Sequence, residues 1–313
     1  MTRSSAPEPS RDNDTADETA APHDTLPCVL SFNASDPTGA GGVVSDAMVI
    51  ASIGAHALPV ITGAYVRDTR EIMGHASLGD DAVAEQAGAV AEDIPLHAIK
   101  IGFAGSAEAV AAIAAFVSDY PAVPVVAYMP DLSWWSEDEI DNYLDAFREL
   151  LLPQVAVLVG NNTTLRHWLL PESTTDRRAR ATDLARAAGE LGVSYVLVTG
   201  IPAVGDQLGN VLASAQGELF SQSYERIDAG FLGAGDILSA ALTALIATGS
   251  ELTEAVAEAL QYLDQALDHG FRPGMGRAVA DRLFWAESDD ADSADDDAPP
   301  SFEIPHPFNE TKH

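Results

Sequence analysis

Gly233-Ala234-Gly235-Asp236 opens an apolar helical stretch near the end of this chain of 313 residues, and it is the segment from which the fold and the chemistry can be read most directly. A Gly-Ala-Gly turn at the start of a helix presents backbone N–H groups without obstruction by Cβ atoms, with the positive end of the helix dipole behind them. We therefore expect Gly233, Ala234 and Gly235 to form an anion hole for a phosphate. Asp236 lies beside this turn, where a carboxylate can take a proton from a hydroxyl that attacks the phosphate.

The position of the turn supports binding over a purely structural role. Glycine is common at turns before helices in α/β proteins, so a lone Gly-x-Gly-Asp does not distinguish the two roles. The stretch that follows, Ile237 to Ile246, is apolar on nearly all sides, which indicates a buried central helix. Such a helix directs its N-terminus at the interior of a cleft.

A second glycine-rich turn, Asp36-Pro37-Thr38-Gly39-Ala40-Gly41-Gly42, follows an apolar run near the start of the chain. Asp36 can serve as a helix cap or Asx turn before the proline, or it can contact a ligand, and the sequence leaves both roles open. Asp46 lies one helical turn further on among apolar neighbours, which favours an inward polar role over a solvated position.

Between these two turns, short β-branched runs alternate with longer helical stretches. This alternation predicts βαβ units and an α/β fold: a three-layer, doubly wound, mostly parallel sheet. After Gly200 the pattern changes to a hairpin, Val211 to Ala215 and Glu218 to Tyr224. The expected strands are Cys28 to Phe32, Pro59 to Ala64, Ala98 to Gly102, Val123 to Tyr128, Val155 to Val159 and Tyr195 to Thr199. The expected helices are Gly42 to Ile53, Asp80 to Glu92, Glu137 to Leu151, Asp176 to Leu191, Asp236 to Thr248 and Glu251 to Asp268.

Charge and composition limit the partners. With 48 acidic against 16 basic residues the formal net charge is −32, so nucleic acid would be repelled. Residues 1–25 and 287–313 are polar and acidic, and we expect them to be disordered tails on a single domain spanning 26–286. The acidity of the remainder fits either a salt-rich cytoplasm or a soluble, self-repelling surface.

Neither a membrane span nor a structural metal is expected. No apolar run reaches the roughly 18 to 20 residues that a membrane helix needs, and the first 25 residues hold no secretory signal. The expected location is therefore the cytoplasm. The single cysteine, Cys28, excludes an internal disulfide and a thiolate zinc cluster, and the eight histidines have no zinc-binding spacing.

Two common nucleotide sites are excluded by the residues present. A Walker A loop needs Gly-Lys-Ser/Thr, and the only lysines are Lys100 and Lys312. A Rossmann fingerprint fails because its third glycine would fall on Val44 and because Asp36-Pro37 occupies the tightest part of the turn.

The segment from Asn33 to Asp46, Asn-Ala-Ser-Asp-Pro-Thr-Gly-Ala-Gly-Gly-Val-Val-Ser-Asp, resembles the first-strand signature of hydroxymethylpyrimidine/phosphomethylpyrimidine kinases, members of the ribokinase-like superfamily. The resemblance covers residues 28–285. Further segments follow in the family's order: Pro59-Val60-Ile61-Thr62-Gly63-Ala64 with Thr69-Arg70, Ile99-Lys100-Ile101-Gly102-Phe103, Leu151-Leu152-Pro153-Gln154-Val155, Asp228 to Ala244, and Gly274-Met275-Gly276.

The resemblance implies a thiamin-pathway kinase that transfers the γ-phosphoryl group of ATP, with Mg²⁺, to 4-amino-5-hydroxymethyl-2-methylpyrimidine or to its monophosphate. Its partners would be this small molecule and, in a homodimer, a second copy of the chain. A neutral heteroaromatic ring needs stacking and a few placed polar groups, and the phosphoryl group needs positioning and fixed N–H dipoles. The residues placed at the substrate are Asp36, Gly41, Asp46, Arg67 and Phe103, and those placed at ATP are Asn162, Thr199 and Gly200.

The chain departs from the family's pattern at four positions. These kinases usually carry Cys at the position of Asp236, so the turn in this chain is more similar to that of pyridoxal kinases and sugar kinases. Arg67 matches a pocket Gln. Leu165 replaces the Glu of an Asn-x-x-Glu motif that begins at Asn162. Tyr128 replaces a strand-end Asp on the metal side, so that Asp131, three residues later, is the possible metal ligand. A pyridoxal kinase and a catalytically weak nucleotide or pyrimidine sensor therefore remain as alternatives.

Two further features keep alternative interpretations. Lys100 lies inside an apolar strand and can either form an ion pair at a strand edge or contact a phosphate or substrate. Trp134-Trp135 can stack on adenine, but the sequence around them favours covering the core or a subunit contact.

Overall fold

The strands of the computed structural model, which describes residues 26–170 and 179–286, form one large sheet and one small one. The large sheet has the order β3-β2-β1-β4-β5-β6-β7-β8-β9. Its strands are β1 (Cys28–Ser35), β2 (His56–Arg67), β3 (Ile72–Ser77), β4 (Ala98–Ile101), β5 (Val125–Tyr128), β6 (Val157–Asn161), β7 (Tyr195–Pro202), β8 (Gln207–Ser214) and β9 (Gly217–Glu225). The small sheet pairs β10 (Phe231–Leu232) with β11 (Ala278–Val279).

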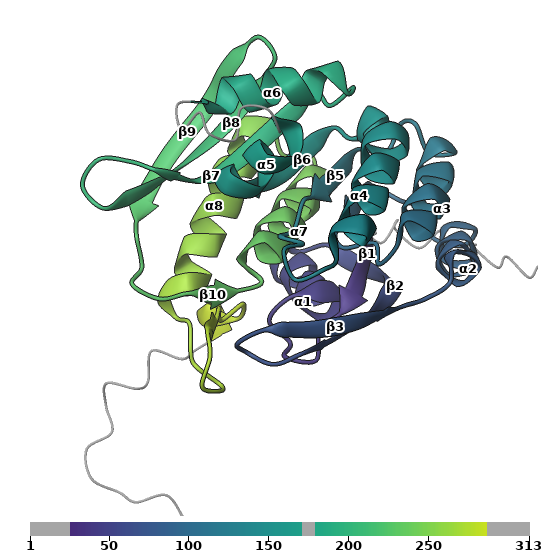
Figure 1. Cartoon of the computed structure of the whole chain (residues 1–313), viewed down its shortest axis with the longest axis horizontal. Coiled ribbons are helices and arrows are strands. Elements are labelled where there is room, and N and C mark those ends of the chain that lie inside the picture. The colour runs from purple at the N-terminus through teal and green to yellow at the C-terminus, as the bar shows by residue number, and fades with distance from the viewer. Residues whose placement is uncertain (1–25, 171–178, 287–313) are drawn as a thin grey trace, which may run out of the picture.

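The central part of the large sheet is parallel and its margins are antiparallel. β2, β1, β4, β5, β6 and β7 pair in parallel, whereas β3 lies antiparallel at one edge. The β8–β9 hairpin forms the other edge, and Figure 1 shows it at the far end of the sheet from β3. The sequence-based prediction of a doubly wound, mostly parallel α/β fold with a hairpin in its C-terminal half is confirmed.

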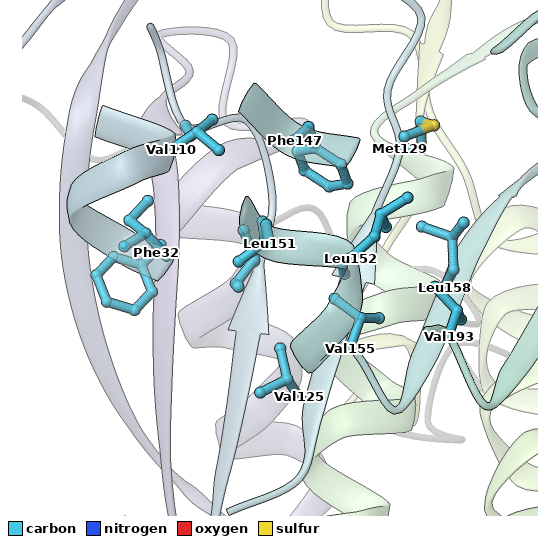
Figure 2. Close-up of a cluster of buried hydrophobic side chains, with 14 of the residues drawn as sticks. Phe32, Val110, Val125, Met129, Phe147, Leu151, Leu152, Val155, Leu158 and Val193 are labelled. Atoms are coloured by element: carbon cyan, nitrogen blue, oxygen red, sulfur yellow. The ribbon is translucent and has the colours of Figure 1, made fainter. Parts of the chain in front are cut away.

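Helices cover both faces of the sheet. They are α1 (Gly42–Ile53), α2 (Asp80–Ala91), α3 (Ala107–Ser118), α4 (Glu137–Ala146), α5 (Asn162–Leu169), α6 (Ala181–Glu190), α7 (Ala234–Ala247) and α8 (Leu252–Asp268). One apolar cluster joins the strands to α2 through α6, and the other joins them to α1, α7 and α8. Figure 2 shows part of the first cluster, where Phe32 of β1 and Val110 of α3 are buried.

Side-chain alternation along β4 decides which face each residue meets. Ile99 and Ile101 belong to the cluster under α2 through α6, and Ala98 belongs to the cluster under α1 and α7. Because successive side chains of a strand point to opposite faces, Lys100 is directed toward α1 and α7. The strand β4 lies between β1 and β5, in the interior of the sheet and not at its edge.

Several elements differ from the expectation. Helix Glu137 to Leu151 ends as an α-helix at Ala146 and continues as a π-helical turn, Phe147–Leu151. β3, α3, α5 and the small β10–β11 sheet were not predicted. β3 has little alternation to signal it, since its residues are exposed or half-buried and it pairs with one neighbour only. The expected tails 1–25 and 287–313 lie outside the described residues, and so does the start of the helix expected over Asp176 to Leu191, of which α6 is the described part.

Among the described residues, the model contains no helix of the length and apolarity required to cross a lipid bilayer.

Candidate active site

The two glycine-rich turns, far apart in the sequence, pack against each other. Gly233 has a left-handed backbone with φ of 73°, and a Cβ atom there would lie 1.9 Å from the carbonyl oxygen of Ala40. A Cβ atom on Gly41 would lie 2.7 Å from Oδ2 of Asp236. Glycine is therefore required at both positions, because any side chain would separate the turns. The contact places the start of α7 directly over the start of α1.

Asp236 lies in the first turn of α7, where several donors hold its carboxylate. Its Oδ1 accepts hydrogen bonds from Asn33 Nδ2 at 2.8 Å and from Lys100 Nζ at 3.0 Å, and its Oδ2 accepts one from the Gly42 backbone N–H at 3.2 Å. The side chain keeps 17% of its surface exposed, toward the cavity. Burial by itself raises the pKa of Asp236, but the Lys100 ammonium and the hydrogen bonds from Lys100, Gly42 and Asn33 bring it below the usual value.

Lys100 and Asp46 form the floor beneath Asp236, and both are fully buried. Lys100 Nζ donates to Asp46 Oδ1 at 2.6 Å, and Asp46 Oδ2 accepts from Ser31 Oγ at 2.7 Å. Asp46 therefore has the inward polar role that its position suggested. It does not line the cavity, however, so its expected place against the substrate is occupied by the residues above it. Of the two interpretations of Lys100, the ion pair is the one present, although in the sheet interior.

A cavity of about 660 Å³ lies at the carboxyl ends of the parallel strands. In the sheet, β2 and β3 lie on one side of β1, and β4 and the later strands lie on the other, so the strand order reverses at β1. Ligands of open α/β sheets bind at such a switch point. Of the expected site residues, those that line the cavity are Asp36, Gly41, Arg67, Asp131, Thr199, Gly233, Ala234, Gly235 and Asp236.

Asp36 both shapes the turn and faces the cavity. Its Oδ1 accepts the Thr38 backbone N–H at 2.9 Å, and its Oδ2 accepts the Gly41 N–H at 3.2 Å. The same Oδ2 lies 3.4 Å from Nη1 of Arg67. Of the two roles left open by the sequence, the turn is present, and contact with a ligand stays a prediction for a side chain that lines the cavity. Arg70 and Arg277 also line this cavity, so cations gather there although the protein as a whole is acidic.

Aromatic side chains form the wall next to Arg67. Tyr65 and Trp134 line the cavity, with ring centroids 5.9 Å apart in an edge-to-face arrangement. Phe103 is 1% exposed and stacks behind Tyr65, with centroids 5.4 Å apart and planes at 18°. The expectation that Phe103 covers the substrate ring is not met in this structure, because Tyr65 stands between Phe103 and the cavity. Trp135 packs on the edge of Phe103, which agrees with the expected covering of the core.

The far end of the cavity is formed by the ends of β6 and β7. Asn161 and Thr199 line it, whereas Asn162 and Gly200 do not. Asn161 is the N-cap of α5, and its side chain accepts the Thr164 backbone N–H at 2.9 Å, so Asn162 begins the helix and is turned away from the cavity. Gly200 lies in a bulge between β7 and β8 and donates to Asn210 Oδ1 at 3.4 Å.

Asp131, the possible metal ligand of the sequence analysis, lines the cavity. Asp131 is exposed in the cavity, and its Oδ1 accepts the Ser133 backbone N–H at 2.9 Å. Over the described ranges 26–170 and 179–286, no group of three or more His, Cys, Asp or Glu side chains could hold a metal ion. Mg²⁺ in nucleotide sites needs only one or two carboxylates beside phosphate oxygens and waters, so Asp131 fits such an ion.

Leu165, which stands where the family's motif has Glu, is fully buried. Gly160 has no room for a Cβ atom, because it would lie 2.8 Å from Leu165 Cγ. Leu165 therefore belongs to the apolar core under α5, and its side chain does not line the cavity.

The side-chain contacts around Asp236 were not predicted from the sequence. Asn33 and Lys100 contact Asp236 through hydrogen bonds that join segments 203 and 136 positions apart. Nothing local in the sequence announces such pairing, although the Asn at the end of the first strand and the single lysine of the domain are unusual enough to examine. Tyr128 was noted only as a replacement, yet a Cβ atom on Gly235 would lie 2.2 Å from its ring. Tyr128 therefore covers the Gly-Ala-Gly turn.

Solved structures define the class of fold. The chain is similar to the pyridoxal kinase of Bacillus subtilis, solved as an ADP complex, with a TM-score of 0.72 and 20% identity, covering 83% of this chain and 99% of that one. It is also similar to phosphomethylpyrimidine kinase from Clostridium difficile, with a TM-score of 0.61 and 22% identity, covering 76% and 100%. The molecule thus has the ribokinase-like α/β fold.

The family follows from the sequence comparisons. The model of the phosphomethylpyrimidine kinase family matches residues 36–281, and the chain belongs to this family. The hydroxymethylpyrimidine/phosphomethylpyrimidine kinase of Streptomyces coelicolor is 28% identical over 265 residues, which cover 84% of this chain and 96% of that protein. The thiamine biosynthesis bifunctional protein ThiED of Geobacter sulfurreducens is 28% identical over 261 residues, 83% of this chain and 53% of that protein. The resemblance seen in the motifs is confirmed.

Proposed function

We propose that this chain is an ATP-dependent kinase that phosphorylates 4-amino-5-hydroxymethyl-2-methylpyrimidine, its monophosphate, or both, in thiamin biosynthesis. The observation that carries the proposal is the meeting of a carboxylate, Asp236, with the N-terminus of a buried helix at one end of a large cavity. This geometry occurs in a chain that belongs to the phosphomethylpyrimidine kinase family. Phosphoryl transfer needs a proton acceptor and fixed dipoles for the phosphoryl oxygens, and both are present.

Asp236 would act as the general base. The substrate hydroxyl gives its proton to Oδ2 of Asp236 while its oxygen forms a bond to the γ-phosphorus and the bond from that phosphorus to the β–γ bridging oxygen breaks, which releases ADP. The proton then resides on the Asp236 carboxyl. The backbone N–H groups of the first turn of α7 lack partners within the helix, and the turn lines the cavity, so Gly233, Ala234 and Gly235 would bind the transferring phosphoryl group.

The remaining walls suit the two substrates. Tyr65 and Trp134 would hold the planar ring, and Arg67, next to Asp36, would meet its polar edge or a phosphate. Asn161, the last residue of β6, and Thr199, its partner on β7, line the cavity and would contact the nucleotide. Mg²⁺, when bound with ATP, would neutralise the phosphate oxygens, and Asp131 is the side chain of this chain that would hold it.

We also propose a domain organisation, a cellular location and an oligomeric state. We place one kinase domain over residues 26–286, in the cytoplasm, and we expect a homodimer. Exposed apolar side chains along β2 and β3, among them Val66 and Met73, give a second copy a surface to cover. Sedimentation at several protein concentrations tests the dimer directly.

A screen of ATP consumption tests the function. Purified protein is mixed with the pyrimidine, its monophosphate, pyridoxal or ribose, and ADP release is measured for the parent and for Asp236→Asn. Turnover of either pyrimidine that is lost in the variant supports the proposal. Turnover of pyridoxal alone would assign the chain as a pyridoxal kinase. Binding of ATP and pyrimidine without turnover by the parent would assign it as a sensor.

A further inference from the structure

The buried ammonium of Lys100 is shared between two carboxylates. Lys100 is fully buried, and it is the single lysine within residues 26–170 and 179–286. A buried charge is costly unless it is paired and hydrogen-bonded. Its Nζ lies 2.6 Å from Oδ1 of Asp46 and 3.0 Å from Oδ1 of Asp236, so it holds together α1 and α7 from the strand β4 between them.

Asn33 bridges the same two carboxylates. Its Nδ2 donates to Asp46 Oδ2 at 3.0 Å and to Asp236 Oδ1 at 2.8 Å. Its Oδ1 accepts the backbone N–H groups of Ala34 at 2.9 Å and Phe103 at 3.2 Å, which fixes the direction of the amide. Gly102 leaves the room for this side chain, because a Cβ atom there would lie 2.5 Å from it. The two carboxylates are therefore joined by one charged and one neutral donor.

The two carboxylates are not equivalent. Asp46 is fully buried and reaches no cavity, whereas Asp236 keeps 17% of its side-chain surface exposed. With all three groups ionised, one positive charge faces two negative ones. Asp46 consequently competes with Asp236 for the ammonium, and the share that Asp236 receives decides how readily it accepts a proton.

We infer that Lys100 is a positioning residue for the reaction: it holds the Asp236 carboxylate ionised and directed into the cavity, and Asp46 weakens this hold by taking part of the ammonium's charge. The inference rests on the proposed role of Asp236 as the base. Lys100 itself does not line the cavity and so does not touch substrate. Both oxygens of Asp236 accept hydrogen bonds, and Oδ2, held only by Gly42, retains a lone pair for the incoming proton.

Charges and titratable groups on the surrounding elements agree with this division. Burial raises the pKa of Asp46 to about 6, against the lowering effect of Lys100. Burial also raises the pKa values of Tyr65 from β2 and Tyr128 from β5, so both phenols are neutral near Asp236. The Asp36 carboxylate faces the same Gly41 as Asp236 but is paired with Arg67. Lys100 is thus the cation that contacts Asp236.

Two variants that differ only at Lys100 isolate its effect. Asp46→Asn leaves a balanced pair, Lys100 with Asp236. Asp46→Asn with Lys100→Met leaves Asp236 without a cation and without a second buried carboxylate. Replacing a whole buried ion pair by neutral groups of similar size is often tolerated, whereas removing one partner is not, so the double variant is the one expected to fold.

The measurement is the pH dependence of kcat/KM for the pyrimidine substrate. Activity rises with pH as Asp236 loses its proton, so a lower pKa moves the rise to lower pH. We expect this rise at lower pH in Asp46→Asn than in the parent. In the double variant we expect it at higher pH than in Asp46→Asn by about one unit or more. An equal loss of rate at every pH, with an unmoved profile, would overturn the inference. So would a weakened binding of ATP in the double variant at a pH where it is folded.

Titration of the Asp236 carboxyl carbon by NMR separates this inference from the proposed function. If Lys100 stabilises the ionised form of Asp236, the Asp236 carboxyl must titrate at higher pH in the double variant than in Asp46→Asn. This holds whether or not Asp236 is the base. If the carboxyl titration moves and the kinetic profile does not, the base assignment fails and with it the role of Lys100 in the reaction, and only the charge coupling stands. If the carboxyl titration is the same in both variants, the coupling itself is wrong.

Discussion

The two ends of the cavity are built in different ways. At the end formed by α1 and α7, Asp236 is held by Asn33, Lys100 and the Gly42 backbone at 2.8 to 3.2 Å. At the end formed by β6 and β7, Thr199 Oγ1 lies 3.4 Å from the Gly160 carbonyl, a long contact. The first end is here called the base end, after the role proposed for Asp236, and the second the nucleotide end, after its proposed ligand. At the nucleotide end Asn161 is held by one N-cap bond at 2.9 Å and Thr199 by the long contact alone. The proposed base is therefore positioned by more hydrogen bonds than the residues proposed to contact ATP.

The largest expected effect comes from removing the negative charge of Asp236 at the base end. Asp236→Asn keeps the shape of the side chain but cannot accept the proton, so kcat should fall by about 10² to 10⁴. Affinity for ATP, measured by calorimetry, should remain as in the parent because the nucleotide end is untouched. The exposed Asp119→Asn at the end of α3 is the matched control. A kcat for Asp236→Asn within about threefold of that control would remove Asp236 from the role of base.

A second, smaller effect is expected where the turn meets its cover. Gly235→Val should lower kcat by about 10², because its Cβ atom would lie 2.2 Å from the Tyr128 ring and would displace the turn or the ring. Gly74→Val, where a Cβ atom meets nothing within 4 Å, controls for the new side chain. Adding Tyr128→Ala to Gly235→Val should restore part of the activity by making room.

Thermal melting of the same variants shows whether catalysis or folding is affected. A loss of melting temperature large enough to account for the lost activity of Gly235→Val would mean that this glycine matters for the fold and not for the phosphate.

Arg67 tests substrate choice separately from the base end, because it lines the cavity and pairs with Asp36 and not with Asp236. If Arg67 meets a phosphate, the ratio of kcat/KM for the pyrimidine monophosphate to that for the free alcohol should fall about tenfold in Arg67→Gln, as a charge-assisted hydrogen bond is lost. The exposed Arg186→Gln on α6 is the control. An unchanged ratio would restrict Arg67 to its contact with Asp36, 3.4 Å away.

The smallest effect is expected at the nucleotide end. Thr199→Val removes a hydroxyl that makes one long contact and keeps the shape of the side chain, so KM for ATP should rise about fivefold at most with kcat unchanged. A fall in kcat comparable to that of Asp236→Asn would show that the nucleotide end is as strictly organised as the base end.

The base end and the nucleotide end also differ in how far the sequence predicts them. The turn Gly233 to Asp236 is contiguous, so its conformation, its helix and its carboxylate could be read together. The partners of Asp236 could not, because Lys100 and Asn33 approach it only through the packing of β1 and β4 under α7. At the nucleotide end the resemblance pointed to Asn162, whereas the residue that lines the cavity is Asn161, the N-cap of the helix α5, which the sequence did not predict.

The aromatic wall illustrates a further limit. Phe103 follows directly after a strand that the sequence identifies, but the depth at which its ring lies depends on Tyr65, which comes from another strand. Strand order and residue spacing place a side chain on a face. They do not say which of two stacked rings is the outer one. The alternation of strands and helices, by contrast, is a local property, and the doubly wound, mostly parallel sheet predicted from it was confirmed.

The bond between Asn33 and Asp236 spans 203 positions and has a consequence for synthesis on the ribosome. Asn33, Asp46 and Lys100 leave the exit tunnel first, and Lys100 with Asp46 is already a neutral pair, 2.6 Å apart. The nascent chain can therefore pair the charge of its lysine before the last third of the polypeptide exists, and the cover that α7 gives this face of the sheet comes later. Asp236 is synthesised later, with α7, after its donors Asn33 and Lys100. Asp236, the proposed base, is thus added after Asn33, Asp46 and Lys100, and a chain released before α7 would carry these three residues without it.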